Sequence, residues 1–228
     1  MALELLYDER PPGAGGSRGA PLLLVLHGWG TYRGPLFELA KGFDPRLTIV
    51  AAQAPVRIGP GAYRWFDYQR DPATGALTID DDEERASLAR LERFVDQLVA
   101  TWAPGALYLF GHSQGATMAL TLTLRRPARF AGCAHLNGRV LSRRLAEVER
   151  PAPLAGLPFF FGHATQDPII PLSLGRQTRD HVQRLGGSIV SREYPVGHDV
   201  TPEIISHVST WLTDTITQQH APRRHHSA

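Results

Sequence analysis

The chain has 228 residues, of which 43% are hydrophobic and 20% are charged. A chain of this length and composition can form one globular domain with a large core, which excludes a disulfide-stapled miniprotein and a disordered chain. Its 24 Lys and Arg against 22 Asp and Glu leave a net charge of +2, and no basic block occurs before the last few residues. Nucleic-acid binding therefore has little support.

The cysteine content and the first residues indicate a reducing compartment. Cys133 is the one cysteine, so an internal disulfide and a zinc site built on cysteine pairs are both excluded. The first ten residues mix acidic residues with leucines and lack the successive regions of a signal peptide. No apolar run approaches the roughly 18 residues that a membrane span needs. We expect a cytoplasmic protein with no membrane span.

In chain order, Leu3–Tyr7 predicts an edge strand, and Pro11–Arg18, rich in Pro, Gly and Ser, predicts a flexible loop. Six short apolar runs follow, each bounded by turn residues. Continuous apolar runs of this length are typical of strands buried on both faces, as in a parallel sheet covered by helices. The runs are Leu22–His27, Leu47–Ala52, Ala106–Gly111, Phe130–Leu136, Pro158–Gly162 and Ser188–Tyr194.

Amphipathic segments that predict helices separate these runs. Apolar residues recur at helical spacing through Glu83–Ala100, which predicts one long helix. The alternation of strands and helices predicts an α/β fold with right-handed crossovers. Shorter helices are expected at Pro35–Lys41, Gln114–Arg125, Leu172–Leu185 and Pro202–Thr217.

No repeat or second domain is visible, so residues 1–217 are predicted to form a single domain. The polar segment 218–228 is expected to be a disordered tail. Recruitment of an acidic partner by its Arg and His residues is the less common explanation for such a tail. Gln53–Asp82 has no helical pattern but holds a cluster of aromatic residues, so a functional segment or a hairpin is expected there.

The strongest chemical signal is the pentapeptide Gly111–Gly115, with the sequence G-H-S-Q-G. It directly follows a predicted strand and directly precedes a predicted helix. In that context Ser113 lies on a sharp strand-to-helix turn, and the two glycines relieve the crowding that such a turn creates. We interpret Ser113 as a nucleophile; the alternative is an ordinary turn in which this serine caps the helix.

A serine nucleophile needs a base and an orienting acid, which follow the serine in the order acid, then histidine, in α/β-hydrolases. Asp167 follows the predicted strand Pro158–Gly162, and His198 follows the last predicted strand. These two residues are the predicted acid and base. Asp199 and Glu203 also lie near His198 in sequence, but we expect them to point away from it or to cap the following helix.

An oxyanion hole needs two backbone N–H groups near the nucleophile. The residue after the serine, Gln114, supplies the first. The glycine-containing segment Leu26–Gly30 follows an early predicted strand, and Trp29 within it is the predicted second donor. The bulky Trp29 side chain is also expected to shape the mouth of the acyl site.

Four histidines lie at or near the carboxyl ends of predicted strands, the side on which ligands bind in open α/β sheets. Their spacing resembles no metal-binding pattern such as H-E-x-x-H, so neither a metal nor another cofactor is expected. The four are His27, His112, His135 and His163.

Together these segments resemble the phospholipase/carboxylesterase family of α/β-hydrolases, which includes the acyl-protein thioesterases. The resemblance spans about Leu22 to Trp211. This chain departs from the family pattern at His112, where an apolar residue is common, and at Ala116, where glycine is common. The matching pieces are L-H-G-W-G at 26–30, Q-A-P at 53–55, W-F-D at 65–67, G-H-S-Q-G at 111–115, Q-D-P-I-I-P at 166–171 and Gly197-His198.

The resemblance implies an α/β-hydrolase fold with little or no lid and a substrate pocket that Trp65 and its neighbour Phe66 help to line. Trp29 is also predicted to line this pocket because of its bulk, and His112 because it adds a polar ring beside the nucleophile. For the two aromatic residues at 65 and 66, core packing is the alternative. The expected activity is that of a serine carboxylesterase acting on small esters or thioesters. A lysophospholipase or acyl-protein thioesterase and a catalytically silent binding protein are the alternatives. A homodimer is also possible.

Overall fold

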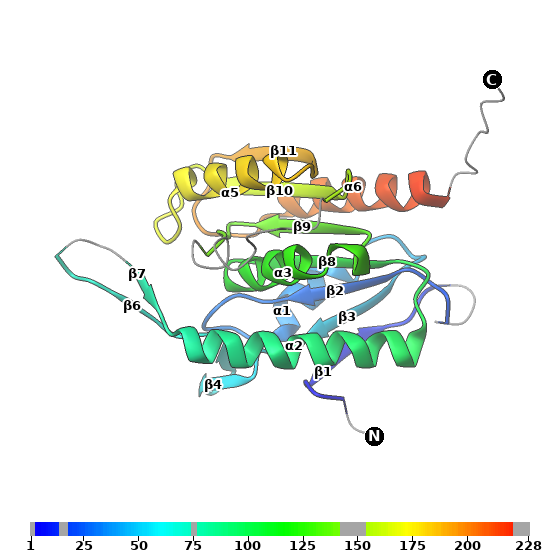
Figure 1. The fold of residues 1–228 in the computed structure, drawn as a ribbon, viewed down its shortest axis with the longest axis horizontal. Coiled ribbons are helices and arrows are strands. Elements are labelled where there is room, and N and C mark those ends of the chain that lie inside the picture. The colour runs from blue at the N-terminus through cyan, green and yellow to red at the C-terminus, as the bar shows by residue number, and fades with distance from the viewer. Residues whose placement is uncertain (1–2, 14–17, 74–76, 142–153, 221–228) are drawn as a thin grey trace.

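The computed structural model describes residues 3–13, 18–73, 77–141 and 154–220 (Figure 1). Its centre is a seven-stranded sheet in the order β1-β3-β2-β8-β9-β10-β11. Only β1 runs antiparallel to its neighbour, β3, and the other adjacent pairs are parallel. The strands are β1 (Tyr7–Arg10), β2 (Leu22–Leu26), β3 (Thr48–Ala52), β8 (Leu107–His112), β9 (Gly132–Leu136), β10 (Pro158–Ala164) and β11 (Ser188–Tyr194).

Each of the six predicted apolar runs forms one of the parallel strands, so the predicted α/β architecture is confirmed. The edge strand was predicted too early: β1 begins at Tyr7. Leu5 is buried in the core instead, and it is Tyr7–Arg10 that pairs with β3. The predicted loop Pro11–Arg18 lies partly outside the described residues.

Helices cover both faces of the sheet. They are α1 (Arg33–Ala40), α2 (Asp81–Trp102), α3 (Gln114–Arg125), α5 (Leu172–Arg184) and α6 (Pro202–His220), with a short 3₁₀ turn at Pro127–Arg129. No helix among the described residues is long and apolar enough to cross a membrane.

The last helix, α6, extends further than the sequence predicted. It continues to His220, three residues into the segment expected to be a disordered tail. The side chain of Gln219 explains the extension, because it accepts a hydrogen bond from the Tyr108 hydroxyl at 2.7 Å and donates one to the carbonyl of Ala131 at 2.9 Å. Residues 221–228 of the predicted tail lie outside the described residues.

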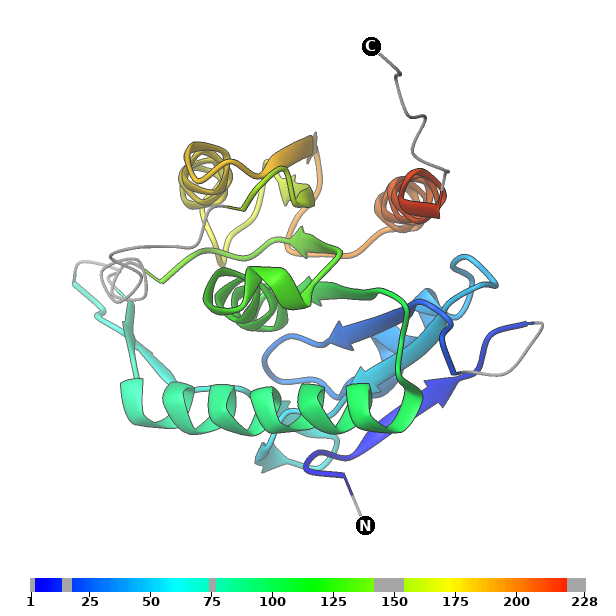
Figure 2. The same ribbon diagram turned by 45° about the vertical axis from the view of Figure 1, so that its right-hand side comes forward.

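Figure 2 shows helices on both sides of the sheet. The core consists of two hydrophobic layers, one on each face of the sheet. Side chains of β2 alternate between them, as in any strand: Leu22, Leu24 and Leu26 join one layer, and Leu23 and Val25 join the other. The first layer packs against α2, α3 and α5, and the second packs against α1 and α6. Burial on both faces explains why these strands are continuous apolar runs.

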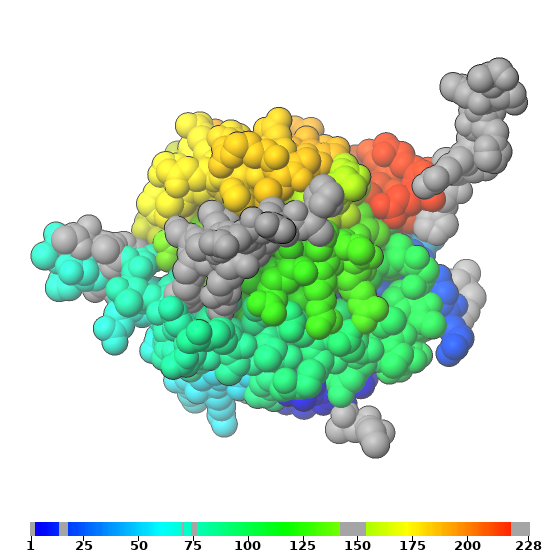
Figure 3. All heavy atoms as spheres, in the orientation of Figure 1, coloured from blue at the N-terminus to red at the C-terminus, as the bar shows by residue number. Residues whose placement is uncertain are grey.

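The segment Gln53–Asp82, for which a functional segment or a hairpin was expected, forms two hairpins. One consists of β4 (Val56–Gly59) and β5 (Ala62–Arg64), and the other of β6 (Tyr68–Arg70) and β7 (Leu77–Ile79). The β6–β7 hairpin leaves the body of the protein beside the start of α2 and protrudes from the surface (Figures 1 and 3). Its base borders the site described below.

The buried position of Cys133 leads to a first testable prediction. Its side chain lies within β9, and burial raises the pKa of the thiol to about 12. Because the thiolate is the reactive form, alkylation by iodoacetamide at pH 8 should be about a thousandfold slower in the native protein than in guanidinium. Intact mass against time measures both rates, with Cys133→Ser as the unreactive control. Rapid alkylation of the native protein would contradict this burial.

Candidate active site

Ser113, Asp167 and His198 follow the carboxyl ends of three parallel strands. Ser113 lies between β8 and α3, Asp167 between β10 and α5, and His198 between β11 and α6. Because parallel strands end at the same edge of the sheet, residues far apart in sequence meet there.

The turn that carries Ser113 is sharp and strained. Ser113 has φ 57° and ψ −120°, a backbone conformation that residues other than glycine rarely adopt, and its N–H donates to the carbonyl of Leu136 at 2.9 Å. A Cβ at Gly111 would lie 2.4 Å from the carbonyl oxygen of Gly115, and a Cβ at Gly115 would lie 2.1 Å from that of Leu26. Both flanking positions therefore require glycine.

The three predicted residues form a chain of two contacts at hydrogen-bonding distance. Ser113 Oγ is 2.9 Å from His198 Nε2, and His198 Nδ1 is 2.6 Å from Asp167 Oδ2. The carboxylate that contacts His198 is therefore Asp167 rather than Asp199 or Glu203. In this arrangement Nδ1 donates to the carboxylate, which leaves Nε2 as an acceptor toward the serine hydroxyl.

The environment of Asp167 favours its charged form. Burial alone raises the pKa of this carboxyl group, but hydrogen bonds from His198 and from the backbone N–H groups of Ile170 and Ile169 outweigh burial and leave the pKa below its usual value. Both N–H groups donate to Oδ1 at 2.8 Å. The buried His163 also contacts this loop, because its Nε2 lies 2.9 Å from the carbonyl oxygen of Ile170.

Backbone contacts tie the Asp167 loop to the loop that carries His198. The N–H of Thr165 donates to the carbonyl of Tyr194 at 2.7 Å, and that of Gln166 donates to the carbonyl of Val196 at 3.1 Å. Asn137 directly follows β9 and links the end of β10 to the His198 loop. Its Oδ1 accepts from the N–H of Ala164 at 2.9 Å, and its Nδ2 donates to the carbonyl of Asp199 at 3.3 Å. Asp167 and His198 are thus held by one network.

Asn137 provides a second prediction, because it combines these bonds with a left-handed backbone at φ 48°. Asn137→Ala should lower the free energy of unfolding by about 3 kcal/mol, since it leaves a buried N–H unpaired and keeps the strain. Asn137→Gly relieves the strain and should cost about 2 kcal/mol. Urea denaturation measures both. Equal stability of Asn137→Ala and wild type would contradict this role.

The two predicted oxyanion donors lie beside Ser113. Gly28 is so close that a Cβ on it would be 3.2 Å from the Cβ of Ser113, which brings the following residue, Trp29, to the site. Within the described residues, the backbone N–H groups of Trp29 and Gln114 donate to no protein acceptor. The N–H of Gln114 is one of the unpaired donors in the first turn of α3. Both groups are available to a bound oxygen.

Buried His27 positions the segment that contains Trp29. Its Nδ1 lies 2.8 Å from the carbonyl oxygen of Gly28, and its Nε2 accepts a hydrogen bond from the N–H of Ala54 at 3.0 Å. The amide of Gln53 lies 2.9 Å from the same Nε2. Burial lowers the pKa of His27 to about 4, so the ring is neutral and can accept these bonds.

The side chain of Gln114 has a structural role that the sequence did not reveal. Its Oε1 accepts from the N–H of Trp65 at 3.1 Å, and its Nε2 donates to the carbonyl of Phe66 at 2.7 Å. The Trp65 indole in turn donates to the carbonyl of His27 at 2.8 Å. The motifs at 26–30, 65–67 and 111–115 are therefore parts of one hydrogen-bonded unit.

A cavity of about 280 Å³ opens beside Ser113 and His198, and we call it the catalytic cavity. Of the four residues predicted to line the pocket, Trp29 and Phe66 do so. Trp29 is 47% exposed, so its side chain lies at the rim. The other lining residues are Tyr68, Leu77, Ile79, Gln114, Thr117, Arg139, Ile169 and Ile170.

Trp65 and His112 do not line this cavity, and their assignment to the pocket was wrong. Trp65 is completely buried, with its indole N–H already bonded to His27. His112 packs its ring against that of His198, with 4.9 Å between centroids, and does not reach the cavity. Loss of hydration, together with the nearby His198, lowers the pKa of His112 to about 3, which keeps this ring neutral.

Sequence reasoning missed most of the cavity wall. Leu77 and Ile79 lie on alternate positions of β7, and this period-two pattern within Gln53–Asp82 is a signal that could have identified a strand. Ile169 and Ile170 directly follow the predicted acid, so their place near the site could also have been inferred. Arg139 had no such signal, because only the fold brings it here.

The described residues contain no group of three or more His, Cys, Asp or Glu side chains that could hold a metal ion. His135 and His163 are both buried, and burial lowers the pKa of His135 to about 3. These two histidines are part of the interior packing.

A mostly parallel sheet with a strained serine turn after β8 and helices on both faces defines an α/β-hydrolase. The chain belongs to the phospholipase/carboxylesterase family, whose pattern matches residues 14–216. A probable carboxylesterase of Oryza sativa is 27% identical over 89% of this chain and 80% of its own length. Acyl-protein thioesterase 1 of Neurospora crassa is 28% identical over 67% of this chain and 65% of its own length.

Other similarities agree with the fold. The crystal structure of esterase PE8 has a TM-score of 0.79, with 24% identity over 92% of this chain and 99% of that one. A second Oryza sativa relative, 24% identical over 71% of this chain and 68% of its own length, is described as a probable inactive carboxylesterase. Family membership alone therefore does not establish activity.

Proposed function

We propose that the protein is a serine carboxylesterase that hydrolyses small carboxylic esters or thioesters through an acyl-enzyme. The observation that carries the proposal is the continuous contact from Ser113 through His198 to Asp167, at 2.9 and 2.6 Å, on the floor of an open cavity. The family includes proteins named carboxylesterases, which agrees with this reaction.

The proposed reaction begins when Ser113 Oγ attacks the acyl carbonyl while His198 Nε2 takes the hydroxyl proton. Asp167 holds the imidazole and stabilises the positive charge that it gains. The carbonyl oxygen becomes an oxyanion, which accepts hydrogen bonds from the N–H groups of Trp29 and Gln114, each worth about 3 kcal/mol. His198 then gives its proton to the departing alkoxide or thiolate, and Ser113 remains acylated.

Deacylation repeats these steps with water. His198 takes a proton from the water as its oxygen attacks the acyl carbon, and it returns the proton to Ser113 Oγ when the acyl–oxygen bond breaks. The products are a carboxylic acid and free enzyme. The neutral His112 ring behind His198 adds no second positive charge next to the imidazolium.

The size of the catalytic cavity favours short acyl groups, because about 280 Å³ is near the lower limit of small-molecule pockets. Lysophospholipase or acyl-protein thioesterase activity is the alternative, and the similarity to an acyl-protein thioesterase favours it. That alternative requires room for a long acyl chain. A silent binding protein is a further alternative that the intact Ser113–His198–Asp167 contact argues against.

Hydrolysis of 4-nitrophenyl esters with acyl chains of two to sixteen carbons tests the proposal. We expect turnover that is highest for short chains and falls steeply beyond about four carbons, because a longer neutral chain outgrows the cavity. Rates that rise toward sixteen carbons would favour the long-chain alternative instead. Absence of hydrolysis of every ester by folded protein would contradict the proposal.

A further inference from the structure

His163 lies near the end of β10, and its side chain is buried. Its Nε2 is 2.9 Å from the carbonyl oxygen of Ile170. Because a carbonyl oxygen can only accept, Nε2 carries a hydrogen and donates it to Ile170. The reaction steps described above give this hydrogen bond no part. A buried histidine therefore uses a donor to hold the loop that carries Asp167.

Ile170 connects His163 to the carboxylate. Its carbonyl accepts from His163, and its N–H donates to Asp167 Oδ1 at 2.8 Å. The same oxygen accepts from the N–H of Ile169 at 2.8 Å, which leaves Oδ2 to contact His198 Nδ1 at 2.6 Å. The position of Ile170 thus sets the direction in which Oδ2 faces. A displacement of Ile170 would change the contact between Asp167 and His198.

His163 does not compete with His198 for the carboxylate. His163 Nε2 is 3.8 Å from Asp167 Oδ2, which is beyond hydrogen-bonding distance. A ring that turned toward Oδ2 could donate to it and draw the carboxylate away from His198. The bond to the Ile170 carbonyl therefore holds the loop and also keeps the His163 donor off the carboxylate.

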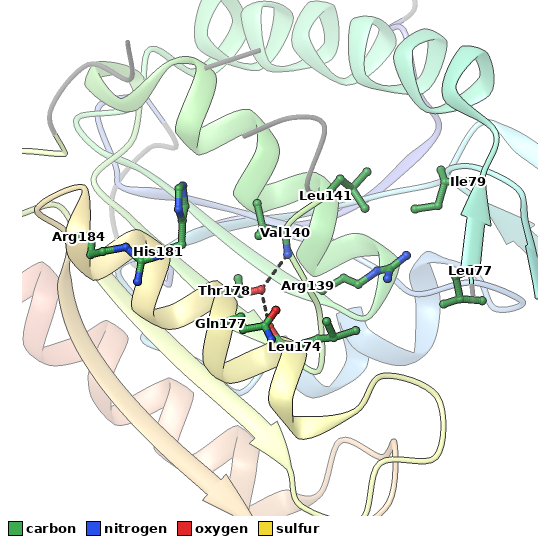
Figure 4. Close-up of a pocket in the computed structure, with 10 residues that line it drawn as sticks. All are labelled: Leu77, Ile79, Arg139, Val140, Leu141, Leu174, Gln177, Thr178, His181 and Arg184. Carbon is green, nitrogen blue, oxygen red and sulfur yellow. Dashed lines mark hydrogen bonds between the residues drawn. The ribbon is translucent and has the colours of Figure 1, made fainter. Parts of the chain in front are cut away.

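Helix α5 confines the His163 ring. A Cβ on Gly175 would overlap His163 Nδ1 and would lie 2.7 Å from Cγ, so the helix packs directly against the ring. Helix α5 is itself tied to the segment after β9, because the hydroxyl of Thr178 accepts from the N–H of Val140 at 2.9 Å (Figure 4). The ring is thus held between the helix and the Ile170 carbonyl to which it donates.

We propose that His163 is a positioning residue for the esterase reaction, in which it fixes Ile170 so that Asp167 Oδ2 faces His198. The inference rests on the proposed esterase function. Ile170 is buried, so its carbonyl loses a donor when His163 is removed, and we expect the loop to shift until another partner is found. The carboxylate shifts with the N–H groups that bind it.

His163→Leu tests the proposal, because leucine fills space but cannot donate. We expect kcat for a short 4-nitrophenyl ester to fall by about 10- to 100-fold through misplacement of His198. KM should change little, because His163 does not line the catalytic cavity. His163→Gln, whose amide can donate to the carbonyl, should keep kcat within about threefold of the wild type. His207→Leu is the matched control and should leave kcat unchanged, since His207 contacts the Tyr194 hydroxyl at 3.1 Å.

Proton NMR observes the affected contact directly. A hydrogen in a short bond between an imidazole and a carboxylate resonates far downfield, and its absence from His198→Ala assigns the signal to His198 Nδ1–H. We expect this resonance to move upfield or to disappear in His163→Leu and to stay in place in His163→Gln. A histidine that only filled space would not change it.

Gly175→Ala disturbs the same ring without removing its donor. The new Cβ would overlap Nδ1 of His163, so the ring has to move, and kcat should fall by about fivefold or more with KM nearly unchanged. Gly42→Ala is the matched control, because the nearest atom to its new Cβ is 3.8 Å away. Gly175→Ala decides the question if urea denaturation shows that His163→Leu does not fold.

Failure of this inference and failure of the proposed function give different results. Wild-type kcat in His163→Leu, an unchanged downfield resonance in that variant, or a His163→Gln protein as impaired as His163→Leu would each overturn the positioning role while esters are still hydrolysed. Wild-type kcat in Gly175→Ala would overturn it as well. Absence of ester hydrolysis by the folded wild-type protein would instead contradict the esterase function on which the inference rests.

Discussion

Replacing Ser113 by alanine is expected to lower kcat/KM for a short ester by about 10⁴-fold or more. The substitution removes only Oγ, the atom that lies 2.9 Å from His198 Nε2. Alanine keeps the Cβ and therefore leaves the strain of the turn unchanged. The measurement is steady-state hydrolysis of a 4-nitrophenyl ester by both proteins.

Two controls distinguish a loss of catalytic activity from a loss of the folded state. The urea midpoint of Ser113→Ala should match that of the wild type, because the hydroxyl makes no other bond in the described structure. His207→Ala should retain activity, since His207 Nδ1 contacts the Tyr194 hydroxyl at 3.1 Å and lies on α6 rather than beside the serine. Activity of Ser113→Ala near the wild-type level would rule out this residue as the nucleophile.

Replacing Gly115 by alanine is expected to have the second large effect, on stability as well as on activity. The new Cβ would lie 2.1 Å from the carbonyl oxygen of Leu26 and 2.6 Å from that of His27. Both neighbours are backbone atoms at the end of β2 and directly after it, so no side-chain rotation relieves the overlap. We expect a loss of about 3 kcal/mol or more in the free energy of unfolding, measured by urea denaturation.

The same substitution should displace the segment that carries Trp29 from Ser113, so kcat should fall even in the folded fraction. Gly42→Ala is the matched control: the nearest atom to its new Cβ is the carbonyl oxygen of Leu39 at 3.8 Å, and the change should alter stability by less than about 1 kcal/mol. A Gly115→Ala protein as stable and as active as Gly42→Ala would show that α3 does not pack against β2 as described.

The sequence predicted the central sheet well because strands that are buried on both faces are continuous runs of apolar residues. All six apolar runs became strands, and Gln114–Arg125 became α3 with the predicted ends. The edge strand and the end of α6 were less accurate. The start of β1 depends on its pairing with β3, and the end of α6 depends on the hydrogen bonds of Gln219. Both are tertiary contacts, which cannot be predicted from the local sequence.

The structure brings together the candidate residues for which motif and chain order coincide. Ser113, Asp167 and His198 each follow a recognisable strand, so their meeting at one edge of the sheet follows from the topology. The pocket wall was harder, because aromatic residues line cavities and fill cores equally well. Trp65 and Phe66 are adjacent in sequence, yet the first is buried in the core and the second lines the catalytic cavity.

Mass spectrometry of the intact protein after treatment with a fluorophosphonate, followed by peptide mapping, tests the central claim most directly. The reagent phosphonylates a serine only where base and oxyanion hole activate it, so no substrate has to be chosen. We predict one adduct, located on Ser113 and absent from Ser113→Ala and His198→Ala. Folded wild-type protein that forms no adduct, or forms it on another serine, would contradict the account.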